Sequence, residues 1–253
     1  MRVFALSDIH IDYDANAEWV AGLSVADYQD DVLILAGDVS DDLKLLDWCL
    51  GTLASRFKKV LFVPGNHELW VIREDKRKNS LQKFDDVCAV VESSGASMQV
   101  FRERGVSIIP LLGWYDYSFG EPSKELRSVW MDYRACRWPA GFTDKEVALH
   151  FEKLNEKQIG RTVGKVITYS HFLPRIDLMP GFIPRESRAL FPVLGTVRLE
   201  AQLRGLNADL HVYGHSHVNR HVSIDGVSYI NNAFGYPSET GIASKSLMCI
   251  HEC

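Results

Sequence analysis

Five short apolar runs, rich in β-branched side chains, are spaced along the chain. They are residues 3–6, 32–36, 60–63, 166–169 and 210–213. Each run leads directly into a polar or glycine-containing segment, which is typical of a strand that is buried on both faces. Two further runs, residues 106–112 and 227–230, predict additional strands for the same reason.

Apolar residues between these runs recur with the period of an α-helix. The helical stretches are residues 43–57, 80–94, 143–160 and 200–206. Gly95 is a suitable C-terminal stop for the second of them, and Thr143 and Glu146 have the spacing of a capping box at the start of the third. The alternation of strands and helices predicts a fold of the α/β class.

A cluster of polar residues follows each of the five apolar runs. The clusters are Asp8-Ile9-His10, Gly37-Asp38, Gly65-Asn66-His67-Glu68, Ser170-His171 and Gly214-His215-Ser216-His217. Any one of them has an ordinary structural explanation, such as a turn, a helix cap or a hydrogen-bonded histidine. The occurrence of all five together indicates a binding site, because ligands of an open α/β sheet bind beyond the carboxyl ends of its strands. The pattern therefore predicts a metal site and favours a site for two metals.

The order Asp-x-His, Gly-Asp, Gly-Asn-His-Glu, His, Gly-His-x-His resembles the calcineurin-like metallophosphoesterase superfamily. The matching positions run from Asp8 to His217 with no motif missing. The resemblance implies an α/β (α+β) fold in four layers, a central β-sandwich flanked by helices, with a dinuclear metal centre that hydrolyses phosphate esters. By position, one metal would be held by Asp8, His10, Asp38 and His217, and the other by Asp38, Asn66, His171 and His215. Asp38 would bridge the two.

The donor atoms of this predicted centre restrict the metals that it could hold. Imidazole nitrogens with carboxylate and amide oxygens suit first-row ions, whereas the absence of cysteine argues against a thiolate zinc or iron–sulfur site. We expect two divalent or trivalent ions, manganese first, with iron, zinc or nickel also compatible. One aspartate can span ions about 3.5–4 Å apart, and such a pair would polarise the phosphate and supply a bridging hydroxide as the nucleophile.

His67 is the motif histidine that the ligand assignment leaves over. Because it is adjacent to Asn66, we expect it to lie close to the metals, as a general acid to the leaving oxygen or as a charge stabiliser. Asp41 matches the family position that hydrogen-bonds and orients this histidine, and a carboxylate there would favour the imidazolium. Asp41 could equally be the N-cap of the helix predicted over residues 43–57, and the two roles can coexist.

Two segments without a clear period are expected to lie near the site. Residues 114–142 form an insertion rich in aromatic side chains, most of which we expect in the core or in a lid. Trp114 directly follows a strand and is predicted to line the pocket. Residues 172–194 contain four prolines and follow His171. A stiffened loop there could direct Arg185 or Arg188 to a substrate phosphate, although surface arginines are common.

Length and charge narrow the class of protein further. A chain of 253 residues, 46% of them hydrophobic, can bury one large core, so we expect a single domain over residues 1–253. The net charge of −5 makes a nucleic-acid partner unfavourable. No apolar run has the length of a membrane span or of a signal peptide. Five cysteines without a Cys-x-x-Cys pair argue against a disulfide framework and favour the reducing cytoplasm.

The predicted activity is hydrolysis of a phosphate mono- or diester, with a small phosphorylated molecule or a nucleotide as the substrate. The residues after Gly37-Asp38 lack the tyrosine of purple acid phosphatases and the Arg-Gly of Ser/Thr protein phosphatases. Two alternatives stay open: a catalytically silent scaffold of the same fold that binds a protein, and a nuclease. A scaffold would be expected to have lost ligands, whereas the predicted ligand set and His67 are complete. These motifs predict no particular oligomeric state.

Overall fold

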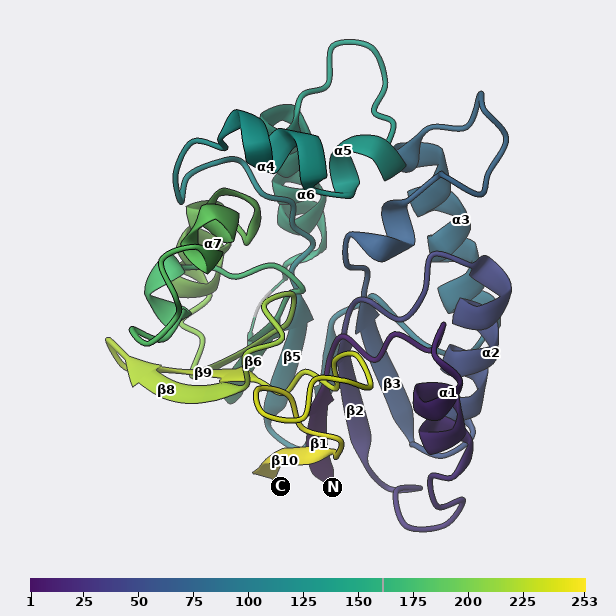
Figure 1. The fold of residues 1–253 in the computed structure, drawn as a ribbon. Coiled ribbons are helices and arrows are strands. Elements are labelled where there is room, and N and C mark those ends of the chain that lie inside the picture. Colours follow the sequence, from purple (N-terminus) through teal and green to yellow (C-terminus); the bar gives the residue numbers. More distant parts are fainter. Residues whose placement is uncertain (161) are drawn as a thin grey trace.

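Two β-sheets face one another in the middle of the molecule (Figure 1). The computed structural model describes residues 1–160 and 162–253. One sheet has the order β10-β1-β2-β3 and is built from β1 (Arg2–Leu6), β2 (Val32–Ala36), β3 (Lys59–Val63) and β10 (Met248–Glu252). The other has the order β4-β5-β6-β7-β9-β8 and is built from β4 (Phe101–Glu103), β5 (Val106–Pro110), β6 (Lys165–Tyr169), β7 (Leu210–Tyr213), β8 (Arg220–Ile224) and β9 (Val227–Asn231).

Both sheets have a parallel centre and antiparallel edges. In the first sheet β1, β2 and β3 are parallel, and β10 pairs antiparallel with β1. In the second sheet β5, β6, β7 and β9 are parallel, and β4 and β8 form the antiparallel edges. Because parallel strands end at the same edge of a sheet, the segments that follow the central strands collect at one end of the sandwich.

Helices cover the outer faces of the two sheets (Figure 1). Those beside the four-stranded sheet are α1 (Asp14–Ala21), α2 (Leu43–Ala54) and α3 (Ser80–Ser93), and those beside the six-stranded sheet are α6 (Asp144–Gln158) and α7 (Val197–Gly205). Near the carboxyl ends of the central strands lie α4 (Lys124–Val129) and α5 (Asp132–Ala135). Three 3₁₀ turns complete the chain order: η1 (His67–Leu69), η2 (Ile176–Leu178) and η3 (Ser187–Val193). The predicted fold, a β-sandwich flanked by helices, is confirmed.

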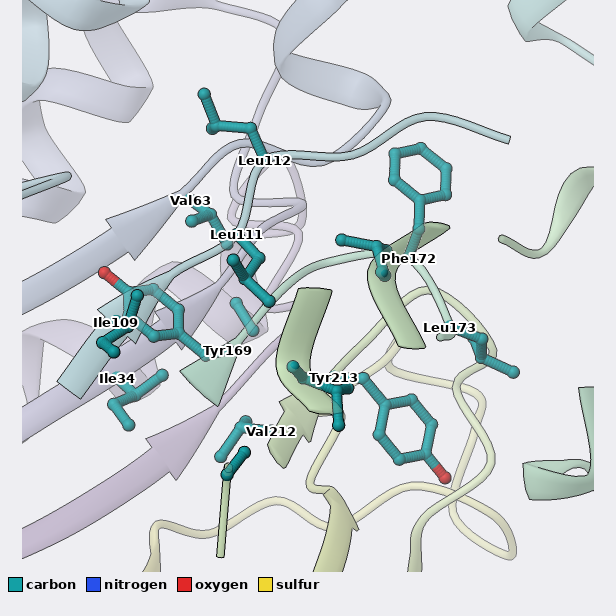
Figure 2. Close-up of a cluster of buried hydrophobic side chains, with 14 of the residues drawn as sticks. Ile34, Val63, Ile109, Leu111, Leu112, Tyr169, Phe172, Leu173, Val212 and Tyr213 are labelled. Carbon is teal, nitrogen blue, oxygen red and sulfur yellow. The ribbon is translucent and has the colours of Figure 1, made fainter. Parts of the chain in front are cut away.

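The apolar runs are continuous because each central strand is buried on both faces. In β1, Val3 and Ala5 belong to the core between the sheets, whereas Phe4 and Leu6 belong to the core under helices α1 to α3. Successive side chains of a strand point to opposite faces, so apolar residues predominate along the whole length of such a strand. Side chains from the two sheets meet in the inner core, as Figure 2 shows for Ile34, Val63, Ile109, Tyr169 and Val212.

Helix α2 begins with a different cap from the one considered in the sequence. Asp42 is the N-cap: its backbone is extended, and its Oδ1 accepts from the amides of Lys44 at 2.8 Å and Leu45 at 3.4 Å. Asp41 is therefore not the N-cap, which corrects that interpretation. The reason is that the first helical residue is Leu43, so only its immediate predecessor has the geometry to cap it.

Within the described part of the chain, no helix has both the length and the apolar character needed to cross a membrane. The five cysteines are all free thiols. The cytoplasmic location and the single domain over residues 1–253 stay predictions.

Candidate metal centre

The polar segments after five central strands converge at one end of the sandwich. Asp8 and His10 follow β1, Asp38 follows β2, Asn66 follows β3, His171 follows β6, and His215 and His217 follow β7. All seven side chains are buried, with exposed fractions between 0 and 9%. The structure thus brings together every residue that the sequence predicts as a ligand.

These side chains form two groups that share Asp38. Asp8, His10, Asp38 and His217 make up the first, which we call the Asp8 group, and their donor atoms lie within 4.8 Å of one another. Asp38, His171 and His215 do the same in the second, the His171 group. The Oδ1 atom of Asn66 lies 3.2 Å from His171 Nε2 and so joins the second group. This is the partition that the family resemblance implies.

In the His171 group two imidazole nitrogens face one another. His171 Nε2 lies 3.0 Å from His215 Nδ1. The opposite nitrogens are occupied, because His171 Nδ1 donates to the carbonyl of Ala36 at 2.9 Å and His215 Nε2 to that of Val193 at 3.1 Å. Each neutral ring therefore turns a lone pair toward the other ring. Such an arrangement is stable only with a proton or a cation between the rings, so this donor set fits a metal ion.

The Asp8 group repeats this arrangement with a carboxylate as the outer partner. His217 Nδ1 donates to Glu239 Oε2 at 2.7 Å, which leaves His217 Nε2 facing His10 Nε2 at 3.1 Å. Asp8 Oδ1 lies 3.3 Å from the same His217 Nε2. Metal-binding histidines usually have this arrangement: a carboxylate holds one ring nitrogen, and the other ring nitrogen points to the remaining donors.

Each group favours one protonated imidazole in the protein without a cation. Burial by itself would lower the pKa of His171 and of His217, but the neighbouring aspartates outweigh it and raise these pKa values to about 9 and about 10. Burial dominates at His10 and His215, where it lowers the pKa to about 3. One ring in each group therefore competes for a proton, and that proton must leave when a cation binds.

The backbone at the predicted ligands is strained. Positive φ angles occur at Asp8 (52°), His10 (41°), Asp38 (55°), His215 (67°) and His217 (53°). A non-glycine residue in this region costs on the order of 1–3 kcal/mol and persists only where the surroundings fix it. Five of the nine such non-glycine residues in the described ranges are predicted ligands. Strain is thus concentrated where the side chains must point inward together.

The glycines of the motifs are required by this close packing. A Cβ atom on Gly65 would lie 2.1 Å from Asp38 Oδ1, and one on Gly37 would lie 2.6 Å from His171 Nδ1. Gly37 also has a φ of +82°, which favours glycine. Any side chain at these positions would displace a predicted ligand.

Glu68 links two of the ligand segments, a role that the sequence did not reveal. The side chain is fully buried, and its carboxylate accepts from the backbone amides of Asp38, Val39, Ser40 and Gly65 at 2.6 to 3.0 Å. Burial, assisted by the charge of Asp38, raises the pKa of Glu68 to about 7, and the amide donors oppose that shift. The only signal in the sequence was its place at the end of the Gly-Asn-His-Glu motif.

Comparison with known proteins agrees with this geometry. The calcineurin-like phosphoesterase family matches residues 1–219. The chain belongs to this family. It is also 29% identical over 265 residues to the [acyl-carrier-protein] phosphodiesterase PptH of Mycobacterium tuberculosis, covering 94% of this chain and 78% of PptH. The crystal structure of the phosphopantetheinyl hydrolase PptH from the same organism superposes with a TM-score of 0.74 and 26% identity, covering 93% of this chain and 90% of that one. The predicted activity class is confirmed: the chain is a metal-dependent phosphoester hydrolase.

His67 lies beside the cluster rather than inside it. Its Nε2 atom is 3.8 Å from Asp38 Oδ2, and its side chain is 15% exposed. The ring stacks on Trp70 with centroids 3.7 Å apart. Asp41, the predicted partner of His67, instead pairs with Arg73, whose Nε atom lies 3.0 Å from Asp41 Oδ2. Among the described residues no hydrogen bond joins Asp41 to His67, so orientation of this ring by Asp41 stays a prediction.

The structure changes the expectations for two of the three predicted substrate residues. Trp114 is fully buried in the inner core, and its indole N–H donates to Asp144 at 2.9 Å, so it does not line an open pocket as predicted. Trp114 follows β5 at the rim, but Trp138 and Phe172 pack edge-on against its indole and bury it. Arg188 is exposed but donates to the carbonyls of Gly181 and Ile183 in its own loop.

The third predicted substrate residue, Arg185, is exposed, and its guanidinium makes no hydrogen bond or ion pair within the part of the chain that the structure describes. Its loop is connected to the cluster at Val193, whose carbonyl accepts from His215. A substrate contact by Arg185 stays a prediction.

Proposed function

We propose that the cluster holds two first-row metal ions, manganese first among them, one in the Asp8 group and one in the His171 group. The observation that carries this proposal is the shared carboxylate of Asp38, with a pair of facing imidazole nitrogens in the group on either side of it. A bound metal pair would polarise a phosphate ester and activate water as the nucleophile. The nitrogen and oxygen donors, without a thiolate among them, suit such ions.

We infer that His67 donates the proton that the leaving oxygen needs. It is the histidine of the motif set that belongs to neither metal group, and its side chain is partly exposed at the edge of the cluster. Its backbone amide donates to Asp38 Oδ1 at 3.1 Å, and its ring rests on Trp70, so its position is fixed from two sides. A fixed imidazole close to the reacting phosphate is suited to general acid catalysis.

We propose a phosphodiester as the substrate, in particular one that attaches a phosphopantetheinyl group to a carrier protein. The support is the likeness to PptH, which is named both as an acyl-carrier-protein phosphodiesterase and as a phosphopantetheinyl hydrolase. Sequence reasoning predicted a small phosphorylated molecule instead, and this remains the second candidate. Both substrates place a phosphate ester at the same cluster, so they differ in what must bind outside it.

The test is a comparison of substrates with metal-reconstituted protein. We would follow release of phosphopantetheine from a holo carrier protein by mass spectrometry, beside bis-p-nitrophenyl phosphate, p-nitrophenyl phosphate, a cyclic nucleotide and single-stranded DNA. The proposal expects the carrier protein to be cleaved with the highest kcat/KM. Faster cleavage of a cyclic nucleotide would favour a small substrate, and faster cleavage of DNA would favour the nuclease alternative.

A further inference from the structure

Asp132 is a buried carboxylate next to the cluster for which the proposed reaction has no use. It begins helix α5 in the aromatic insertion and is 2% exposed. Its Oδ1 atom accepts from Asn66 Nδ2 at 2.9 Å and from Trp70 Nε1 at 2.7 Å, and its Oδ2 atom accepts from Trp130 Nε1 at 2.7 Å. All three donors are neutral. A carboxylate buried without a cationic partner is costly, so its position calls for an explanation.

The bond to Asn66 determines which end of that amide faces the metal cluster. Because Nδ2 donates to Asp132, Oδ1 is directed toward His171 Nε2, 3.2 Å away. A reversed amide would present an N–H₂ group to the cluster, and an N–H₂ group cannot bind a cation. Asp132 thus selects the conformation of Asn66 that is able to act as a ligand.

The bonds to the two tryptophans reach two more residues of the site. Trp70 stacks on His67 with an interplanar angle of 28°, and Trp130 lies edge-on to His215 with centroids 5.9 Å apart. Removing the acceptor would release both indoles from their orientation. The Asp132 carboxylate therefore fixes the surroundings of three residues of the site: Asn66, the proposed acid His67, and His215.

The insertion is attached to the rest of the protein by other contacts as well. The amide of Val71 donates to the carbonyl of Ala135 at 2.8 Å. Ser80 and Arg137 exchange two hydrogen bonds, with Ser80 N donating to Arg137 O at 2.7 Å and Arg137 N donating to Ser80 Oγ at 2.9 Å. Anchoring of α5 thus does not depend on Asp132 alone, which separates a positioning role from a purely structural one.

We propose that Asp132 is a positioning residue, which holds Asn66 as a ligand of the His171 group and holds His67 in place through Trp70. The proposal rests on the metal assignment of the proposed function. It makes the aromatic insertion part of the metal site, although the insertion contributes none of the predicted ligands.

Asp132→Asn tests this role, with Asp144→Asn as the matched control. Asp144 also accepts from an indole, that of Trp114, and from the Tyr117 hydroxyl, but it contacts neither Asn66 nor His67. We would titrate the metal-free proteins with Mn²⁺ by calorimetry and record their thermal midpoints. The amide introduced at position 132 has a single, uncharged acceptor oxygen and cannot accept on both sides, so it no longer holds the Asn66 amide as firmly. The expected result for Asp132→Asn is one Mn²⁺ equivalent bound about 10–100-fold more weakly, with the other unchanged. Asp144→Asn should keep both affinities at a comparable loss of thermal midpoint.

A reciprocal substitution separates positioning from general damage. N66D/D132N reverses the polarity of the bond, because the new amide at position 132 can donate to the new carboxylate at position 66. An oxygen still faces His171, so the double variant should recover the Mn²⁺ affinity that D132N loses. The proposal would be overturned if D132N bound both Mn²⁺ equivalents with wild-type affinity. It would also be overturned if D132N and D144N weakened both equivalents to the same extent.

Trp70→Phe tests the second part of the proposal, that Asp132 holds His67 in place through Trp70. This test remains informative if D132N does not fold. It removes the N–H donor but leaves Asn66 bound to Asp132. We expect both Mn²⁺ affinities to be retained and kcat to fall for phosphodiesters with poor leaving groups. An unchanged kcat would refute the proposal that Trp70 holds His67 in place. If wild-type protein binds fewer than two ions, the metal assignment itself is wrong, whereas an unaltered D132N beside a two-ion wild type refutes only the role of Asp132.

Discussion

The two proposed metal groups contain similar donor side chains but are supported by different parts of the chain. Behind the Asp8 group lies the segment after β9, where Glu239 accepts from His217 and Tyr236 stacks on His10 with centroids 4.5 Å apart. The His171 group is held from behind by the carbonyls of Ala36 and Val193, which accept from its two histidines, and by Asp132, which accepts from Asn66. Glu239 and Asp132 thus come from segments that carry none of the motifs, and Glu239 lies beyond the residues 1–219 that match the family.

The difference in support has an electrostatic consequence. The Asp8 group would offer one ion two carboxylates, Asp8 and Asp38, whereas the His171 group would offer only Asp38. Each group also has one outer carboxylate, Glu239 beside His217 and Asp132 beside Asn66, so the Asp8 group keeps one more negative charge. Because a dication is held more tightly by more negative charge, we expect the Asp8 group to bind the tighter of the two equivalents.

The largest effect should come from the residue that the two groups share. Asp38→Ala removes the only carboxylate common to both, so we expect fewer than two bound ions by elemental analysis and hydrolysis near the uncatalysed background. Asp42→Ala is the control, since this N-cap lies four residues away and should cost about 1 kcal/mol of stability while both ions remain. An Asp38→Ala protein with two ions would contradict the bridging assignment.

The next largest effect should leave both groups intact. His67→Ala is expected to retain two ions and to lose about 10²–10⁴-fold in kcat, because only the proton donor is removed. The loss should be smaller for nitrophenyl esters, whose leaving groups need little protonation. Equal losses for good and poor leaving groups would indicate that His67 stabilises charge instead, and loss of an ion would show that it is a ligand.

A smaller effect should be confined to the Asp8 group. Glu239→Gln keeps an acceptor for His217 Nδ1 but removes the charge, so the imidazole becomes a weaker donor. We expect calorimetry to show about 10–100-fold weaker binding of the tighter Mn²⁺ equivalent. Asp132→Asn should weaken the other equivalent. If both variants weakened the same equivalent, the assignment of separate supports to the two groups would fail.

The smallest effect should lie outside both groups, in the loop of residues 172–194. Arg185→Ala is expected to raise KM by roughly tenfold, or about 1.5 kcal/mol for a charge-assisted contact, with unchanged metal content. Arg185→Lys should recover part of this loss. Arg188→Ala is the control, because its guanidinium is engaged with the carbonyls of Gly181 and Ile183. A KM within about twofold of wild type for Arg185→Ala would mean that this loop does not contact the phosphate.

The segments that the sequence predicts best are the central strands. Residues 32–36 and 210–213 coincide with β2 and β7, and the predicted helix over 80–94 differs from α3 by one residue. Burial on both faces makes such strands predominantly apolar, and α3 has both a capping box and a terminal glycine, so local signals were sufficient.

Edge elements were not predicted because their local signals are weak. Strand β10 is only partly buried and includes a cysteine, a histidine and a glutamate, so it forms no apolar run. It becomes a strand by pairing with β1, far away in sequence. Trp114 shows the same limit: its position after a strand suggested a pocket, whereas packing of the insertion around it made it core.

The sequence by itself determined the type and order of the predicted metal ligands, because each directly follows a strand end and strand ends are encoded locally. Only the tertiary structure decided which residues hold those ligands in place. Asp132 meets Asn66 across 66 positions of the chain, and Glu239 meets His217 across 22. No periodicity or short motif specifies a hydrogen bond between such distant residues, because it forms only when the insertion and the segment after β9 fold against the strand ends.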